Sequence, residues 1–281
     1  MKKAAKIIGS FMVLIIAYLC LSLSPIFFQD FLNEEADALI IAHRGASKIA
    51  PENTAASVKA ALNLNPDSIE IDVQQTQDSV VVLMHDTTLD RTTNGKGLVK
   101  ENSFLELKKL DAGSWFSDDF INEGIPTLED IIKLIDGKSE LIIEIKKGDK
   151  YYPNIERNIV KIIAKHQAEP WVIIHSFDSE VLKRVHQLNP NITLHKLLIG
   201  KLKFIPFIIS NEIEALNIDK QPYIKAYSIN YAFANRDFIK LLKSKGKDVN
   251  VWTVNNAHFA NELISIGVNG IITDHPNLLK K

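Results

Sequence analysis

The stretch "LIIAHRGASKIAPENTAASVKAALNLNPDSIEIDV", from Leu39 to Val73, indicates the fold class of this chain. It begins with an apolar run over Leu39–Ala42, continues into a helical period over Thr54–Leu64, and ends in a second apolar run over Ser68–Val73. A strand, a helix and a further strand in this order favour two parallel strands joined by a crossover helix.

The same alternation continues to the end of the chain. Further strands are predicted over Val80–Met84, Glu140–Ile145, Trp171–His175, Ile192–Leu197, Ala226–Ile229, Val249–Val254 and Gly270–Thr273. Further helices are predicted over Leu128–Ile135, Ile155–Lys165, Glu180–Gln187, Arg236–Lys243 and Ala257–Ile264. About eight such units in roughly 240 residues predict an α/β fold, a (β/α)8 TIM-type barrel. An open doubly wound sheet is the alternative, but no Gly-x-Gly-x-x-Gly follows a strand to support it.

One connection is too short for a helix. The strands that end near Val73 and begin near Val80 are therefore expected to form a hairpin or a distorted barrel edge. A two-residue turn at Asp78–Ser79 would pair residues 77 and 80, and it would place His85 opposite Asp72.

Another connection, over about residues 87–126, is unusually long and predicts an insertion after the third strand. Asn94-Gly95 is its clearest turn signal. It ends at Pro126, after which Thr127 can cap the next helix with Asp130 three residues further on. We expect the insertion to lie on the catalytic face of the barrel.

Composition limits the class of protein. A chain of 281 residues with 46% hydrophobic residues and a formal net charge of -1 is typical of one large globular domain or two small ones. The charge argues against a general nucleic-acid binder, which usually has a strong excess of Lys and Arg. A single cysteine, Cys20, excludes an internal disulfide and a Cys-rich zinc site.

The N-terminus predicts a membrane anchor. Three lysines precede an uncharged, mostly apolar run over Ile7–Ile26, and about 20 apolar residues span a bilayer core. Residues 1–37 are therefore interpreted as a cytoplasmic tail, a transmembrane signal anchor and a short linker. The flanking charges predict that residues 38–281, the barrel, lie outside the cell on a single-pass membrane protein. The alternative is a secretory signal that is cleaved, which would release the barrel.

Three carboxylates on apolar strands indicate a metal site. Glu70 and Asp72 are two residues apart on one strand, so both side chains point to the same face. Glu144 lies near the end of another strand, with Lys146 beside it on the same face. Oxygen donors without cysteine suit one hard divalent cation, Ca²⁺ or Mg²⁺, better than zinc. The alternative is that each acid is solvated or paired with a nearby lysine.

Two histidines and two cations complete the pattern. His43 and His85 each close an apolar strand, and imidazoles change charge near neutral pH, so the pair can act as base and acid. Arg44 can hold a phosphate oxygen with its planar fork, and Lys146 can act as a point charge. Together with a divalent cation, these groups predict a phosphodiester substrate.

Successive motifs of the chain resemble the glycerophosphodiester phosphodiesterase family. They are "HRGASKIAPENT", "IEIDVQQTQDSVVVLMHD", "LDRTTNGKG", "IPTLEDII", "LIIEIK", "VWTVN" and "GIITDHP", in order from about Ile41 to Pro276. The resemblance implies a (β/α) barrel with an insertion after the HD motif. It also implies hydrolysis of glycerophosphodiesters to an alcohol and sn-glycerol 3-phosphate.

By motif position, the resemblance also implies roles for individual residues. The implied metal ligands are Glu70, Asp72 and Glu144. The implied acid–base pair is His43 and His85, and the implied phosphate contacts are Arg44 and Lys146. Glu52 of "PENT" resembles an additional ligand or a residue that supports the ligands. Phe177 of "HSFD" and Trp252 of "VWTVN" resemble pocket walls, although either could equally belong to the core.

Several functional alternatives stay open at this point. The nucleophile is either water or the glycerol 2-hydroxyl, with His43 favoured as base and His85 as acid. The substrate is a small phosphodiester, a lysolipid cleaved in the manner of a lysophospholipase D, or a polyglycerol-phosphate wall polymer. "KLKFIPFIIS", Lys201–Ser210, is either an apolar lip for an acyl chain or an ordinary buried helix. A non-catalytic binder of phosphate-containing ligands is disfavoured, because binding alone needs no matched acid and base.

Overall fold

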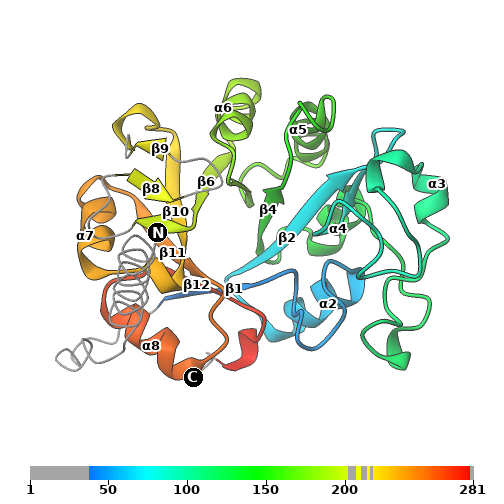
Figure 1. Cartoon of the computed structure of the whole chain (residues 1–281), viewed down its shortest axis with the longest axis horizontal. Coiled ribbons are helices and arrows are strands. Elements are labelled where there is room, and N and C mark those ends of the chain that lie inside the picture. Colours follow the sequence, from blue (N-terminus) through cyan, green and yellow to red (C-terminus); the bar gives the residue numbers. More distant parts are fainter. Residues whose placement is uncertain (1–37, 202–206, 210–213, 216–217, 279–281) are drawn as a thin grey trace, which may run out of the picture. The chain divides into compact units, whose positions relative to one another are not determined.

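The structure, a computed structural model, describes residues 38–201, 207–209, 214–215 and 218–278 (Figure 1). Within these ranges, no helix has both the length and the apolar character needed to cross a membrane. The transmembrane segment predicted from the sequence falls within residues 1–37 and so lies outside the described residues.

The described part of the chain forms a closed barrel of parallel strands. Its neighbours run in the order β1-β12-β11-β10-β6-β5-β4-β2, and the pairing of β1 with β2 closes the ring. The barrel strands are β1 (Leu39–Ala42), β2 (Ser68–Gln75), β4 (Glu140–Ile145), β5 (Val172–Ser176), β6 (Thr193–Leu198), β10 (Ile224–Asn230), β11 (Asp248–Trp252) and β12 (Gly270–Thr273). The predicted (β/α)8 architecture is therefore confirmed.

Helices between these strands surround the barrel (Figure 1). They are α2 (Ala55–Leu64), α4 (Leu128–Ile135), α5 (Ile155–Lys165), α6 (Ser179–Leu188), α7 (Arg236–Ser244) and α8 (Ala257–Ser265). All six had been predicted, and their ends are within two residues of the predicted ones. Thr127 caps α4, and its hydroxyl accepts a hydrogen bond from the Asp130 backbone N–H in the predicted capping box.

The barrel strands are apolar on both faces because helices cover the outside and side chains fill the inside. Four isoleucines from β1, β4, β5 and β12 meet in the interior, with Trp252 packed against them: Ile41, Ile142, Ile173 and Ile272. Because side chains fill the interior, a binding site is expected at the carboxyl ends of the strands, where loops lead into the helices.

Strand β3 (Val81–Leu83) pairs antiparallel with β2, so the predicted hairpin is confirmed. The predicted register is wrong by one residue. Thr76 N–H donates to Val80 O, which leaves a three-residue turn in which Ser79 has a φ of 65°. Such a turn adds one residue to the loop. Consequently Met84, rather than His85, lies opposite Asp72, and Met84 N–H donates to Asp72 O.

The insertion follows β3 and forms an apolar core together with the β3 segment. It contains α3 (Phe104–Leu107) and two short 3-10 turns, Val99–Glu101 and Asp118–Phe120. Its core is built from Val82, Met84, Leu89, Val99, Leu107, Ala112 and Ile125. The Asp111 carboxylate accepts backbone hydrogen bonds from residues 113, 114 and 122, which ties distant parts of the insertion together.

A second, small antiparallel sheet follows β6. It contains β7 (Gly200–Lys201), β8 (Phe207–Ile209) and β9 (Glu214–Ala215). The sequence alternative of a buried helix over Lys201–Ser210 is therefore wrong for residues 207–209. Residues 202–206 and 210 lie outside the described residues.

Candidate active site

Eight of the ten predicted site residues line one cavity of about 170 Å³ at the carboxyl ends of the strands. They are His43, Arg44, Glu70, His85, Glu144, Lys146, Phe177 and Trp252. The other two contact members of this group, since Asp72 forms ion pairs with Arg44 and Lys146, and Glu52 with Arg44. All ten residues therefore belong to one connected site.

The loop after β1 folds back onto β2. Arg44 and Gly45 both have positive φ angles, 54° and 80°, and the Gly45 N–H donates to Glu70 O at 3.0 Å. A Cβ on Gly45 would lie 2.5 Å from Ser57 Oγ, so only glycine fits this approach of α2 to the loop. The turn also brings the Arg44 N–H to 2.9 Å from Glu70 Oε2.

Three carboxylates converge beside the cavity, and two of them, Glu70 and Glu144, line it. Glu70, Asp72 and Glu144 each offer an oxygen atom within 4.8 Å of the others, and all three side chains are buried. Asp72 and Glu144 are register partners on β2 and β4, so their side chains leave the sheet on the same side.

The charges of these three groups are unevenly compensated. Burial, reinforced by the neighbouring carboxylates, raises the pKa of Glu70 well above its usual value. Burial also raises the pKa of Glu144 to about 7, although Lys146 opposes the shift. For Asp72, the charges of Lys146 and Arg44 outweigh burial and hold the pKa below its usual value. Within the cluster, the pKa values of Glu70 and Glu144 are thus raised, whereas that of Asp72 is lowered.

These features fit a divalent cation. Asp72 Oδ1 and Glu144 Oε1 are buried. Among the described residues, the cation that pairs with them is the Lys146 ammonium, at 3.0 and 2.9 Å. Three carboxylate oxygens with spare lone pairs form a donor set suited to a hard cation such as Ca²⁺ or Mg²⁺.

Asn53 orients one of the three carboxylates and was missed in the sequence. Its side-chain Nδ2 donates to Asp72 Oδ2 at 2.8 Å, and its Oδ1 accepts the Asp72 N–H at 2.9 Å. Asn53 has a φ of 56°, a conformation that asparagine tolerates better than most residues. The feature of the sequence that could have identified Asn53 is its position in the motif "PENT".

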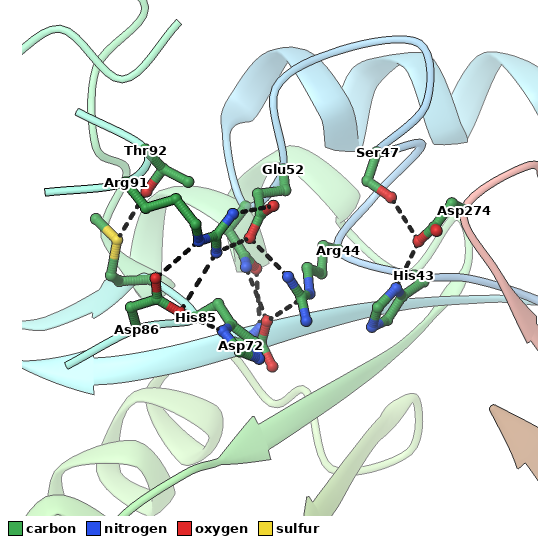
Figure 2. Close-up of polar contacts among 12 residues, drawn as sticks. His43, Arg44, Ser47, Glu52, Asp72, His85, Asp86, Arg91, Thr92 and Asp274 are labelled. Atoms are coloured by element: carbon green, nitrogen blue, oxygen red, sulfur yellow. Dashed lines mark hydrogen bonds and ion pairs between the residues drawn. The ribbon is translucent and has the colours of Figure 1, made fainter. Parts of the chain in front are cut away.

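Each of the two histidines is held by an aspartate (Figure 2). His43 Nδ1 lies 2.6 Å from Asp274 Oδ1, and His85 Nδ1 lies 2.6 Å from Asp86 Oδ1. An ionised carboxylate can only accept hydrogen bonds, so the Nδ1–H of each histidine donates the hydrogen bond. Nε2 of each neutral ring is then free to accept a proton. Asp274 also accepts hydrogen bonds from Ser47 and Asn255, which fix its orientation.

The aspartates remain ionised over a wide pH range. A hydrogen bond from Arg91 is the main cause that lowers the pKa of Asp86 to about 2. At Asp274, the hydrogen bond to His43 and further polar contacts outweigh burial and lower the pKa of the carboxyl. Burial lowers the pKa of His85, although the charge of Asp72 opposes this shift. Asp86 and Asp274 were also missed in the sequence, although each directly follows a predicted site residue or strand.

Glu52 contacts arginines rather than joining the carboxylate cluster. Its Oε1 lies 2.7 Å from Arg44 Nη1, and both of its oxygens accept hydrogen bonds from Arg91. Of the two alternatives left by the sequence, this arrangement favours a supporting residue over an additional metal ligand.

His175 is a further pocket residue that the sequence analysis did not single out. It lies on β5 in register with Glu144, lines the cavity and is 1% exposed. Neither ring nitrogen has a hydrogen-bond partner among the described residues, and burial holds the pKa of the imidazole well below its usual value. The sequence could have indicated His175 in the same way as His43 and His85, since it also lies near the end of an apolar strand.

Two aromatic rings form one wall of the cavity. Phe177 and Trp252 meet edge to face with ring centroids 5.7 Å apart. Trp252 Nε1 donates to Ser228 O at 3.0 Å, which fixes the indole. This part of the lining is therefore apolar, and its indole is held in place.

Comparison with known proteins agrees with this geometry. The model of the glycerophosphoryl diester phosphodiesterase family matches residues 43–278. A glycerophosphodiester phosphodiesterase of Caldanaerobacter subterraneus subsp. tengcongensis is 40% identical over 245 residues, 86% of this chain and 96% of that protein. One from Bacillus subtilis (strain 168) is 34% identical over 261 residues, 86% of this chain and 85% of that protein.

A solved structure shows the same similarity. It is that of an Oleispira antarctica phosphodiesterase in complex with the product sn-glycerol-3-phosphate. The two structures superpose with a TM-score of 0.77 at 28% identity, over 86% of this chain and 94% of the other. The present chain belongs to the glycerophosphoryl diester phosphodiesterase family, which is a family of hydrolases.

Proposed function

We propose that this protein hydrolyses glycerophosphodiesters to an alcohol and sn-glycerol 3-phosphate, with a divalent cation and with His43 and His85 as the acid–base pair. The observation that supports this most strongly is the cavity itself. Two histidines, each held at Nδ1 by an aspartate, line the same cavity as the buried carboxylate cluster. The names of the relatives support the same reaction.

Glu70, Asp72 and Glu144 would hold the cation, Ca²⁺ or Mg²⁺. When bound, the cation supplies Lewis-acid stabilisation of the charge that develops on the phosphoryl oxygens. Arg44 and Lys146 line the cavity beside the cluster, and they hold the phosphate by charge-assisted hydrogen bonds.

The histidines move the protons. His43 Nε2 accepts the proton of the nucleophile, water or the glycerol 2-hydroxyl, as the new P–O bond forms. His85, protonated at Nε2, gives its proton to the alcohol oxygen as the old P–O bond breaks. If the 2-hydroxyl attacks, the resulting cyclic phosphate is opened by water with the two roles reversed.

The cavity size favours a small substrate group. At about 170 Å³, the cavity is smaller than the roughly 300–1,000 Å³ typical of sites for drug-sized ligands. It suits the glycerol phosphate part of a diester, whereas a long acyl chain would have to lie outside it. The assay below therefore also tests lysolipid and wall-polymer substrates.

The division of the chain is also a proposal. Residues 1–37 would carry the anchor and residues 38–281 the catalytic unit outside the cell, on the evidence of the lysine-flanked apolar run. We expect the full chain to resist alkaline extraction from membranes and its catalytic unit to be accessible to external protease. Recovery of a shortened chain in the medium would support the cleaved secretory signal instead.

The reaction is tested by measuring release of glycerol 3-phosphate from glycerophosphocholine and glycerophosphoethanolamine. The full chain in detergent is assayed with EDTA and then with Ca²⁺ or Mg²⁺ restored. Metal-dependent release from these diesters is the expected result. Release only from lysophosphatidylcholine or polyglycerol phosphate would establish an alternative substrate. No release from any of them by a folded, metal-bound protein would contradict the proposal.

A further inference from the structure

The guanidinium of Arg91 lies between two carboxylates of the active site (Figure 2). Its Nε donates to Asp86 Oδ2 at 2.7 Å, and Nη2 lies 3.4 Å from Asp86 Oδ1. On the other side, Nη1 and Nη2 donate to the two oxygens of Glu52 at 2.8 and 2.7 Å. One planar group thus holds both carboxylates in a forked arrangement.

One branch of this contact leads to His85. Asp86 Oδ1 is the atom that accepts from His85 Nδ1, at 2.6 Å. The Asp86 side chain is 29% exposed, so without a second contact its carboxylate is free to rotate and to exchange partners with water. Because Arg91 holds Oδ2, the plane of the carboxylate is fixed and the imidazole is fixed with it.

The other branch leads to Arg44. Glu52 Oε1 accepts from Arg44 Nη1 at 2.7 Å, and Arg44 Nε lies 3.2 Å from the buried Asp72 Oδ2. Glu52 therefore aligns the guanidinium that faces the cavity, and Arg91 aligns Glu52. The proposed acid–base group and the proposed phosphate contact are joined through a single side chain.

Arg91 itself is carried on a fixed backbone. Leu89 and Thr92, on either side of it, are 1% and 5% exposed, and Leu89 belongs to the core of the insertion. Thr92 Oγ1 contacts Met84 Sδ at 3.3 Å, which ties this segment to the residue before His85. The insertion therefore positions Arg91 through packing and not only through the two ion pairs.

We propose that Arg91 is a positioning residue through which the insertion sets the orientation of His85 and Arg44 together. This inference depends on the proposed phosphodiesterase function. A lysine cannot replace it fully, because an ammonium is a point charge and cannot form both forks at once.

The test compares the wild-type full chain with Arg91→Met and Arg91→Lys in the glycerophosphodiester assay. Groups that hold metal-bound residues in place typically contribute about 10- to 100-fold to activity, and by analogy we expect a kcat loss in this range for Arg91→Met. Because Arg91 also aligns Glu52, and Glu52 aligns the proposed phosphate contact Arg44, we expect KM to rise as well. Arg91→Lys should recover part of the loss, since it can retain one carboxylate.

A double-mutant cycle separates positioning from general loosening. If Arg91 acts on His85 through Asp86, adding Arg91→Met to Asp86→Asn should lower kcat by much less than it does in the wild type. The Nδ1–H proton resonance of His85, followed by NMR, should weaken or shift in Arg91→Met in the absence of any substrate.

The matched control is Asp111→Ala, which removes hydrogen bonds within the insertion but touches no site residue. We expect it to lower the melting temperature and to change kcat less than threefold. The inference is overturned if Arg91→Met retains kcat and KM within twofold of the wild type, or if Asp111→Ala lowers kcat as strongly. Inactive wild-type protein would instead contradict the proposed function.

Discussion

The ammonium of Lys146 lies 3.0 Å from Asp72 Oδ1, and the Asp72 side chain is fully buried. The same ammonium lies 2.9 Å from Glu144 Oε1. Lys146 therefore contacts two of the three carboxylates that would hold a cation, and the charges of Asp72 and Glu144 outweigh burial and raise the pKa of the lysine. A divalent cation bound to this cluster would stabilise the same buried negative charge as the lysine.

This arrangement predicts that Lys146→Met destabilises the protein mainly when no metal is bound. Removing one partner of a buried ion pair costs about 3–5 kcal/mol, because the remaining charge is left uncompensated. A bound divalent cation should offset most of that loss. Urea unfolding in EDTA and in Ca²⁺ or Mg²⁺ measures both values, with the exposed Lys147→Met as control. An equal loss under both conditions would contradict the shared role.

The contact of Asp274 with His43 predicts a large kinetic effect of Asp274→Asn. An asparagine can donate to Nδ1, which favours the wrong tautomer and removes Nε2 as an acceptor. We expect kcat to fall by about 10²- to 10⁴-fold, the range of general acid–base catalysis. Ser47→Ala, which removes a hydrogen bond to the same Asp274 oxygen, should lower kcat far less. Steady-state kinetics distinguishes the two, and similar losses would rule out the tautomer argument.

The turn after β1 predicts that Gly45→Ala is damaging. The position has a φ of 80°, and an added Cβ would meet Ser57 Oγ at 2.5 Å. The substitution should cost more than about 1 kcal/mol of unfolding free energy and should lower kcat, because Arg44 is displaced with the turn. Gly124→Ala is the matched control, since its Cβ would meet nothing within 4 Å. Thermal unfolding and kinetics that are unchanged in Gly45→Ala would show that the loop relaxes freely.

Buried His195 predicts a pH dependence of stability. Burial lowers the pKa of this histidine from 6.5 to about 4 in the folded protein. Between these values the unfolded chain binds a proton that the folded protein does not. Stability therefore falls as pH decreases from 6.5 towards 4, by up to about 1.4 kcal/mol per pH unit from this group.

The contribution of His195 is isolated by comparing urea unfolding of the wild type and His195→Gln at several pH values. The variant should show a shallower decline below pH 6.5. His258→Gln is the control, because the His258 side chain is 83% exposed. Parallel curves for the wild type and His195→Gln would mean that His195 is not the source of the decline.

Local patterns predicted most of the barrel because its strands and helices carry their own periodicity. Runs such as Glu140–Ile145 are apolar except at Glu140 and at the site residue Glu144, and helices such as Leu128–Ile135 have a cap and an apolar stripe. The hairpin register was missed because it depends on the backbone conformation of one turn residue, Ser79. Residue types at Asp78–Ser79 allow both turn lengths.

The sequence could predict those site residues that lie on barrel strands or directly after them. Glu70, Asp72 and Glu144 could be grouped because parallel strands end at one edge of the barrel. Asp274 and Arg91 could not be paired with their partners in this way. The first is 231 residues from His43, and the second lies in an insertion whose packing against the barrel no local pattern describes.

The pairing of β1 with β12, the first and last strands of the barrel in the chain, has a consequence for the nascent protein. A chain still emerging from the ribosome already contains the carboxylate cluster, both histidines, Arg44 and Lys146. It lacks the last strand and Asp274, so His43 has no carboxylate to set its tautomer. On the proposed mechanism, we expect hydrolysis by the nascent chain to stay slow until Asp274 has been synthesised and β12 has paired with β1.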